Sequence, residues 1–315
     1  MRGKGLRNLV GVSRIAYFGP TGTFTEMALA QLEAAGTFDA PVERVSASSP
    51  PAALALVRTG QVDAAVVPIE SSVEGSVPPT MDALALGDRL QIMAETELDV
   101  SFSIVGRPGM TLADVRTVRA YPVAAAQVRG WIEQHLPLAV VEPASSNAGA
   151  AEDVAAGVAD AGVSTALAAE RLGLATLAAQ VADYDGARTR FVLVTKPGPA
   201  PVRTGNDRTS VVLHLDNVPG SLVRAMTEFA TRGIDLTRIE SRPTREEFGT
   251  YLFHLDCVGH IDDGLVAEAL KALHRFSDVR FLGSWPSAVP GGGAPMSDSP
   301  DVQWLESLRR GEEGK

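Results

Sequence analysis

The chain has 315 residues, which predicts about two domains, and 45% of them are hydrophobic, as is usual for proteins with buried cores. The formal net charge of -10 at pH 7 argues against nucleic acid as a partner, because phosphate binding needs a basic face. A site for an anion must therefore be built locally, from backbone N–H groups and a few arginines. The only cysteine, Cys257, has no partner for an internal disulfide and is expected to be a buried, inert thiol in a reducing compartment.

Targeting and metal signals are weak in this sequence. The segment 1–14 is basic but lacks the apolar stretch of a secretion signal, and no segment approaches the apolar length of a membrane span. We therefore expect a cytoplasmic protein with no membrane partner. The histidines show no metal-ligand spacing, so no metal is predicted; they are His135, His214, His254, His260 and His274.

Short apolar segments alternate with helical patterns between residues 15 and 194. A strand is predicted at 15–18, a helix at 24–35, and a strand at 64–67 that ends at Pro68. Further strands are predicted at 100–105, 117–120, 138–141, 161–163 and 191–194. A helix should begin at Pro122 and continue through Ile132, and an alanine-rich helix should follow Asn147. This alternation predicts an α/β fold with mostly parallel sheets.

The turn Gly19-Pro20-Thr21-Gly22-Thr23 is the first candidate binding element. Thr23 and Glu26 have the spacing of a capping box, in which Thr23 caps the helix and Glu26 reaches back. The Gly22 turn would leave the first N–H groups of the helix accessible at the positive end of its dipole, where a carboxylate binds favourably. An ordinary strand-to-helix turn is the alternative.

A polar segment follows the strand that we expect to end at Pro68. Glu70, Ser71 and Ser72 lie at the carboxyl end of this strand, where open α/β sheets bind their ligands. Their carboxylate and hydroxyl groups can hydrogen-bond a polar small molecule. The alternative is a polar surface loop, and Glu74 in the same segment is expected to be solvated.

Gln127 and Thr189 are two further candidates. Gln127 lies in the second turn of the helix that begins at Pro122, where glutamine is often only an exposed helix former. Thr189 comes just before an apolar strand and offers a hydroxyl group, although threonine is common at strand starts. The neighbouring Arg190 can bind a carboxylate in bidentate fashion, but we expect it to have a structural role.

A second module begins after the linker Pro197-Gly198-Pro199-Ala200-Pro201. Strands are predicted at 210–216, 235–241, 251–258 and 279–283, and helices at 220–231 and 263–275. This βαββαβ order is that of the ferredoxin-like unit. After Pro290 the sequence is rich in Gly, Pro and Ser and then charged, so we expect a largely disordered tail with at most one loose turn near Trp304 and Leu308.

The second module has two segments suited to an amino acid. The segment 217–222 joins a strand to a helix through Pro219 and Gly220 and can present helix N–H groups to an anion. Glu240-Ser241-Arg242-Pro243 ends the next strand with a charged pair. Together these segments can bind the two ends of a zwitterion; the alternative is a turn and an ion pair.

In combination, these motifs resemble those of the prephenate dehydratases of the monofunctional bacterial type, which carry a C-terminal ACT regulatory domain. Four motifs resemble the catalytic region of that family: 17–26, 68–72 with Gly75-Ser76, Tyr121-Pro122 with Gln127, and Thr189-Arg190-Phe191. The segments 219–222 and 240–243 resemble the two phenylalanine-binding motifs of its ACT domain. The resemblance extends over about residues 14–285. Ser71 stands where the family usually has Asn, and Tyr121 where it usually has His.

The resemblance implies an α/β catalytic region of two lobes with a cleft between them, similar to periplasmic binding proteins, followed by a ferredoxin-like ACT domain. It implies a catalytic domain at 14–196, with lobe one at about 14–95 and 183–196 and lobe two at about 96–182. A linker at 197–207, an ACT domain at 208–286 and a disordered tail at 287–315 complete the expected organisation.

The implied reaction is the decarboxylating dehydration of prephenate to phenylpyruvate in phenylalanine biosynthesis, with no cofactor and no metal. The implied catalytic residues are Thr189, which would hydrogen-bond the departing hydroxyl, Glu70, which would orient that network, and Ser71. The implied substrate-binding residues are Thr21, Gly22, Thr23, Phe24, Ser72, Gln127 and Phe191.

The ACT module would bind phenylalanine between paired subunits and inhibit the enzyme allosterically, which makes a homodimer or homotetramer the expected assembly. The implied effector-binding residues are Asn217, Pro219, Gly220, Ser221, Leu222, Glu240, Ser241, Arg242 and Pro243.

Two other functions remain open. The enzyme can prefer arogenate, which carries an amine in place of the keto group of prephenate. The chain can also be a non-catalytic amino-acid sensor, with Ser71 marking lost activity; the presence of Thr189 and Glu70 argues against this.

Overall fold

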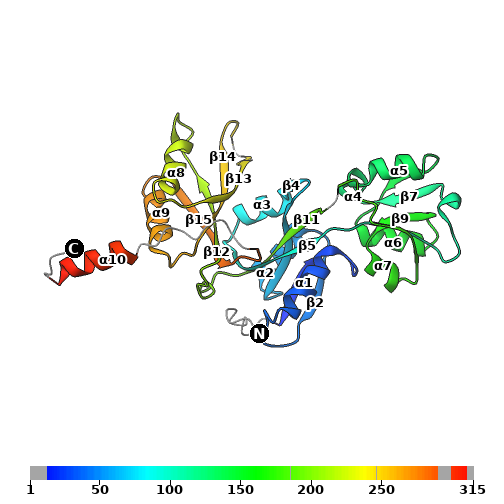
Figure 1. Ribbon diagram of the computed structural model, residues 1–315, viewed down its shortest axis with the longest axis horizontal. Helices are drawn as coiled ribbons and strands as arrows, with labels where there is room; N and C mark the ends of the chain where they lie inside the picture. The colour runs from blue at the N-terminus through cyan, green and yellow to red at the C-terminus, as the bar shows by residue number, and fades with distance from the viewer. Residues whose placement is uncertain (1–12, 185, 246, 290–298, 311–315) are drawn as a thin grey trace. The chain divides into compact units, whose positions relative to one another are not determined.

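The computed structural model describes residues 13–184, 186–245, 247–289 and 299–310, and its described strands form three sheets (Figure 1). The first sheet has the order β2-β1-β3-β11-β5, with β4 paired to β3. Its strands are β1 (Arg14–Phe18), β2 (Glu43–Ala47), β3 (Ala64–Ser71), β4 (Gly75–Ser76), β5 (Gln91–Asp99) and β11 (Arg188–Thr195). The accompanying helices are α1 (Phe24–Ala34), α2 (Pro50–Thr59) and α3 (Pro78–Ala85).

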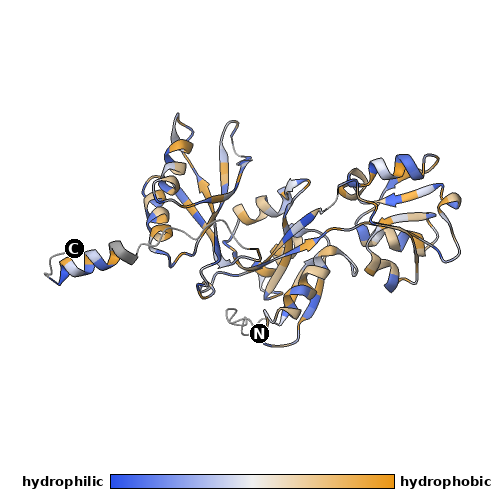
Figure 2. Cartoon of the chain, viewed as in Figure 1, coloured by the Kyte–Doolittle hydropathy of each residue, from blue (hydrophilic) through white to orange (hydrophobic). Residues whose placement is uncertain are grey.

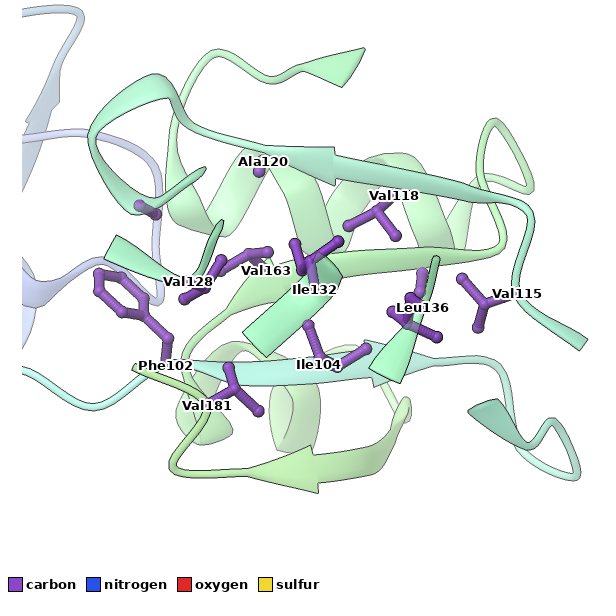
Figure 3. Close-up of a cluster of buried hydrophobic side chains, with 12 residues drawn as sticks. Phe102, Ile104, Val115, Val118, Ala120, Val128, Ile132, Leu136, Val163 and Val181 are labelled. Atoms are coloured by element: carbon purple, nitrogen blue, oxygen red, sulfur yellow. The ribbon is translucent and has the colours of Figure 1, made fainter. Parts of the chain in front are cut away.

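The second sheet has the order β10-β6-β9-β7-β8. Its strands are β6 (Ser103–Gly106), β7 (Thr117–Ala120), β8 (Val140–Pro143), β9 (Ala161–Ser164) and β10 (Ala175–Ala179). The helices here are α4 (Pro122–Gln127), α5 (Arg129–His135), α6 (Asn147–Ala155) and α7 (Ala166–Arg171). Apolar side chains of the strands and of α4 and α5 form one buried core, which includes Ile104, Val118, Val128, Ile132 and Val163 (Figure 3).

The third sheet forms the ferredoxin-like module and has the order β13-β14-β12-β15. Its elements are β12 (Asp207–His214), α8 (Ser221–Ala230), β13 (Leu236–Pro243), β14 (Tyr251–Val258), α9 (Gly264–His274) and β15 (Asp278–Pro286). Both helices cover one face of this antiparallel sheet (Figure 1). Cys257 lies in the core beneath them, as predicted, and burial raises the pKa of its thiol to about 12.

The predicted fold class, an α/β catalytic region followed by a βαββαβ module, is confirmed by these sheets. The prediction of mostly parallel sheets is only partly correct. In the first sheet β1 is parallel to β2 and β3, and in the second β7 is parallel to β8 and β9. However, β6 runs antiparallel to both β9 and β10.

Three local predictions are wrong. Strand β3 does not end at Pro68 but continues to Ser71, because β4 pairs with Glu70 and Ser71 beyond the proline. The helix that begins at Pro122 is interrupted at Val128, whose φ of -119° separates α4 from α5.

The third correction concerns the C-terminal tail. A helix, α10 (Ser299–Arg309), stands where we expected disorder, and it carries both hydrophobic and hydrophilic residues (Figure 2). The side chains of Val302, Trp304, Leu305 and Leu308 on this helix are exposed. Residues 290–298 and 311–315 of the expected tail lie outside the described residues.

The described residues group into two compact units. One contains the described residues up to Thr80 together with Thr96–Leu193, and the other contains Met81–Glu95 together with the described residues from Val194 onward. Among the described helices, none combines the length and apolar character needed to cross a bilayer. Within the same described ranges, His, Cys, Asp and Glu side chains form no group of three or more that could hold a metal ion.

Candidate functional site

The turn that precedes α1 is shaped by two glycines. Gly19 and Gly22 have φ angles of +102° and +94°, which non-glycine residues rarely adopt. Thr23 is the N-cap residue, but its hydroxyl donates to the carbonyl oxygens of Phe18 (3.2 Å) and Pro20 (3.1 Å) and makes no capping hydrogen bond. The capping-box prediction is therefore wrong, because the backbone of the turn supplies nearer acceptors for this hydroxyl.

The Glu26 side chain does reach back past the start of the helix, but to Gly22 and not to the N-cap residue Thr23. Its Oε2 accepts the backbone N–H of Gly22 at 2.7 Å, so this N–H group is already paired. Oε2 also lies 2.6 Å from Nη1 of Arg171, and Oε1 lies 3.0 Å from Nη1 of Arg44. Burial by itself would raise the pKa of Glu26, but the Gly22 N–H and the two guanidinium groups hold the pKa below its usual value.

Glu26 and its turn join the first two sheets within the larger compact unit. Arg171 lies at the end of α7, beside the second sheet, so its ion pair with Glu26 connects α1 to α7. The Thr165 hydroxyl donates to the Gly22 carbonyl oxygen at 3.0 Å. The Phe24 ring meets Phe102 edge to face, with ring centroids 5.7 Å apart. The predicted substrate-binding turn is thus fastened to the second sheet and its helices by polar and aromatic contacts.

We expect Glu26→Gln to lower the free energy of unfolding at pH 7 by about 1.5–3 kcal/mol, because it weakens several charge-assisted hydrogen bonds. The pKa of Glu26 is lowered in the folded state, so its contribution is present above the unfolded pKa of about 4.3 and is lost as the pH falls through the folded pKa. Urea unfolding of both proteins between pH 7 and pH 3 measures this. A difference that stays constant over this range would show that the charge of Glu26 is not responsible.

Glu70 and Arg190 form an ion pair between neighbouring strands. Nη2 of Arg190 lies 2.8 Å from Oε2 of Glu70, and the Arg190 side chain is only 4% exposed, whereas Glu70 is 36% exposed. Arg190 is thus engaged with a carboxylate of the chain itself, in keeping with the structural role expected for it.

Ser71 and Thr189 occupy neighbouring positions on the same two strands. The Ser72 N–H donates to the Arg188 carbonyl oxygen (2.8 Å), and the Arg188 N–H donates to the Ser72 hydroxyl oxygen (2.9 Å). Contacts between positions 72 and 188 and between 70 and 190 place Ser71 opposite Thr189. Because side chains alternate along a strand, Thr189 and Ser71 share the face opposite to the Glu70–Arg190 pair.

The polar segment after Glu70 is a tight hairpin between β3 and β4. The Ser71 hydroxyl oxygen accepts the backbone N–H groups of Val73 and Glu74, both at 3.3 Å. Glu74 is exposed, as expected. Ser71 therefore stabilises the turn with its oxygen, and its O–H remains able to donate to a ligand.

Two of the remaining predicted substrate residues are almost fully buried. Gln127 is the last residue of α4 and is 5% exposed, while Phe191 follows in β11 and is 2% exposed, within the core. The hydroxyl oxygens of Thr21 and Tyr17 lie 3.5 Å apart. Among the described residues, no hydrogen bond joins Thr189 to Glu70, Thr21 or Gln127.

The first predicted effector segment forms the start of α8. Gly220 is the N-cap residue with a φ of +85°, so a side chain here would strain the backbone. The Ser221 N–H donates to the Val218 carbonyl oxygen at 3.3 Å, and Leu222 is 38% exposed. The amide of Asn217 lies close to Gly249, in the loop that connects β13 to β14.

The second predicted effector segment, Glu240–Pro243, lies at the end of β13. We expected Glu240 and Arg242 to form a charged pair, but Arg242 has a different partner. Arg242 forms a bidentate ion pair with Asp82 of α3, with Nε–Oδ1 at 2.9 Å and Nη2–Oδ2 at 3.2 Å. Sequence reasoning missed Asp82, because a single aspartate on a short helix gives no signal of a partner 160 positions away.

Comparison with known proteins agrees with the motifs. Residues 15–199 match the family model described as prephenate dehydratase, and residues 209–275 match that of the ACT domain. A curated prephenate dehydratase from Mycolicibacterium vanbaalenii is 63% identical and covers 94% of this chain and 98% of its own. One from Mycobacterium tuberculosis is 60% identical and covers 95% of this chain and 94% of its own.

A solved structure is similar throughout its length. The prephenate dehydratase of Arthrobacter aurescens, solved in complex with L-Phe, has a TM-score of 0.85 and 41% identity, and the match covers 94% of this chain and 99% of the other. Sequence and structure thus agree over both modules. The chain belongs to the prephenate dehydratase family of hydro-lyases and carries an ACT domain after its catalytic region.

Proposed function

We propose that this enzyme converts prephenate to phenylpyruvate and is inhibited by phenylalanine bound to its ACT domain. The observation that carries the catalytic part is the juxtaposition of Thr189 and Ser71 on adjacent strands, next to the ion pair of Glu70 with the buried Arg190. The similarity to prephenate dehydratases over nearly the whole chain supports the same substrate.

The reaction needs orientation and help for a leaving group more than it needs a strong base. The ring C–OH bond breaks and its electron pair leaves with the oxygen, which takes up a proton to become water. The C–C bond to the ring carboxylate also breaks, carbon dioxide leaves, and the released electrons complete the aromatic ring. Aromatisation supplies the driving force, so a well-placed hydrogen-bond donor at the departing hydroxyl is the main chemical requirement.

We assign that donor to Thr189, with the Ser71 hydroxyl beside it as a second donor to the substrate. Glu70 acts indirectly: its carboxylate is paired with Arg190 on the opposite face, where the pair keeps β3 and β11 in register. This differs from the expectation that Glu70 orients the Thr189 hydroxyl itself. The turn Thr21–Phe24 holds carboxylate or carbonyl oxygens of the substrate. Ser72, whose hydroxyl oxygen accepts the Arg188 N–H, and the buried Gln127 and Phe191 support the site without touching the substrate.

The ACT module provides the proposed regulatory site. The segment Asn217, Pro219, Gly220, Ser221 and Leu222 and the strand end Glu240–Pro243 are the phenylalanine-binding elements. The Arthrobacter aurescens relative was solved as a complex with L-Phe, which supports this ligand for the present chain. Phenylalanine inhibits if it binds the less active state more tightly, typically with a coupling of about 1–3 kcal/mol.

Pairing of two ACT modules is the proposed assembly. Strand β13 lies at the edge of its sheet, and Ile239 on it is 54% exposed. Val223 of α8 is 69% exposed. An open strand edge with apolar side chains nearby suits a second copy of the same module, as a dimer or as part of a tetramer. The cytoplasm is the proposed location.

The test is the formation of phenylpyruvate from prephenate by the purified protein, with and without phenylalanine. We expect turnover that phenylalanine suppresses. Faster turnover of arogenate than of prephenate would establish the alternative substrate. Phenylalanine binding without any turnover would instead identify a sensor, and Ser71→Asn would then test whether Ser71 is the cause.

A further inference from the structure

Helix α3 belongs to both compact units, since the boundary between them falls between Thr80 and Met81. At the first of these residues, the Thr80 hydroxyl donates to the Pro68 carbonyl oxygen of β3 at 2.7 Å. The helix also follows closely after β4, which pairs with Glu70 and Ser71. The start of α3 is therefore fastened to the strand that carries the proposed catalytic residues.

The next two residues of α3 contact the strand that carries the second effector segment. The Asp82 carboxylate accepts hydrogen bonds from Nε and Nη2 of Arg242, at 2.9 and 3.2 Å. It also accepts a hydrogen bond from Arg245. Nη1 of Arg238, on the same strand, lies 3.5 Å from the sulfur of Met81. The Asp82 and Arg242 side chains are 17% and 20% exposed, so solvent screens this pair only in part.

The engagement of Arg242 changes what this residue can do for an effector. Asp82 occupies the edge of the Arg242 guanidinium formed by Nε and Nη2. The Asp82 hydrogen bonds also raise the pKa of Arg242 and keep it charged. A ligand carboxylate at this same edge would have to displace Asp82, so a change at the effector site is felt directly by the pair.

We propose that the pair of Arg242 with Asp82 transmits effector binding from β13 through α3 to β3. This inference rests on the proposed regulation by phenylalanine. A displacement of β13 on effector binding moves Asp82 with it, and Asp82 lies two residues beyond Thr80, which is bonded to the backbone of β3. A short rigid helix held at both points shifts as one piece, so the shift reaches Glu70 and Ser71. Asp82 is a positioning residue in this scheme.

The test is Asp82→Asn, which removes the charge and keeps the size of the side chain. Turnover of prephenate without phenylalanine should stay within about 2-fold of wild type, because Asp82 does not touch the proposed catalytic residues. Calorimetry should still detect phenylalanine binding. Inhibition at saturating phenylalanine should fall below about 2-fold, from the 5- to 150-fold typical of allosteric coupling.

The matched control is Arg245→Ala, which removes the other guanidinium that contacts Asp82. The Arg245 side chain is 66% exposed, and Arg242 keeps its bidentate pair in this variant. The response to phenylalanine should therefore be retained. Loss of the response in this control would overturn the assignment to the Arg242–Asp82 pair.

Two results for Asp82→Asn overturn the proposal. Inhibition equal to that of wild type means that the ion pair is only structural, and loss of phenylalanine binding means that the pair belongs to the effector site. If the wild-type enzyme forms phenylpyruvate but does not respond to phenylalanine, the proposed regulation itself is wrong. This result is obtained before any variant is made.

Hydrogen exchange of the wild-type protein provides a test that does not depend on the folding of a variant. Phenylalanine should change the protection of backbone amides in α3 and in the hairpin between β3 and β4. Unchanged protection in both segments at saturating phenylalanine would overturn the proposal. A change confined to the ACT module would do the same.

Discussion

Replacement of Thr189 by alanine should lower kcat for prephenate by about 10²- to 10⁴-fold, because a positioned proton donor at the leaving group contributes an effect of this size. Thr189 is half-buried at the start of β11, opposite Ser71, where its hydroxyl can face a bound substrate. The phenylpyruvate assay measures the loss directly. KM should change much less than kcat, because the hydrogen bond strengthens as the hydroxyl departs.

The control for this prediction is Thr189→Ser, which keeps the hydroxyl and loses a methyl group. We expect it to retain most of the activity that Thr189→Ala loses. Phenylalanine binding should be unchanged in both variants, which separates a chemical defect from misfolding. If Thr189→Ala and Thr189→Ser lose activity equally, the methyl group and its packing matter more than the hydroxyl.

Replacement of Arg238 by alanine should lower the free energy of unfolding by about 3–5 kcal/mol, since it leaves a buried carboxylate without its main partner. Arg238 donates to both oxygens of Asp256, at 2.9 and 2.7 Å, and the Asp256 side chain is fully buried. Arg208 lies 3.8 Å from Asp256 and compensates only in part. Burial lowers the pKa of the nearby His254 to about 3, so this imidazole is neutral at pH 7 and cannot replace the lost charge.

Urea unfolding of the Arg238→Ala protein measures this effect. The matched control is Arg129→Ala, which removes an arginine from an exposed pair with Glu133 on α5. We expect no clear loss there, because solvent screens an exposed ion pair of this kind. Equal losses in the two variants would show that burial of the Arg238–Asp256 pair has no influence on its contribution.

Local sequence signals predicted the ferredoxin-like module well. The predicted strand 251–258 coincides with β14, and the two predicted helices differ from α8 and α9 by one residue at each end. Turn residues and period-two patterns are properties of neighbouring residues, so they are readable without knowledge of the tertiary structure. For the same reason Gly22 and Gly220 were recognisable as turn glycines, and both have positive φ angles.

Predictions that depended on distant partners were less successful. Glu26 has the spacing of a capping box, but the backbone of its turn and Arg171, 145 positions away, determine where its carboxylate points. Strand β3 passes through Pro68 because β4 and Thr80 supply its later contacts. The partner of Arg242 was equally unreadable, since long-range pairing follows from the packed fold and not from local pattern.

The assignment of Met81–Glu95 to the same compact unit as the ACT module bears on whether the catalytic region can exist by itself. The buried Glu95 side chain pairs with Arg208, Ser287 and Ala288, all of which come from the chain beyond the linker. The backbone of Gly283 approaches Ile92 so closely that a Cβ there would lie 2.3 Å from the Ile92 carbonyl oxygen. Truncation of the enzyme at residue 199 would therefore remove the partners of the buried Glu95 carboxylate and expose apolar surface. The catalytic region and the ACT module, although separate along the sequence, thus share part of one compact unit, and we expect the shortened enzyme to be less soluble than the full chain.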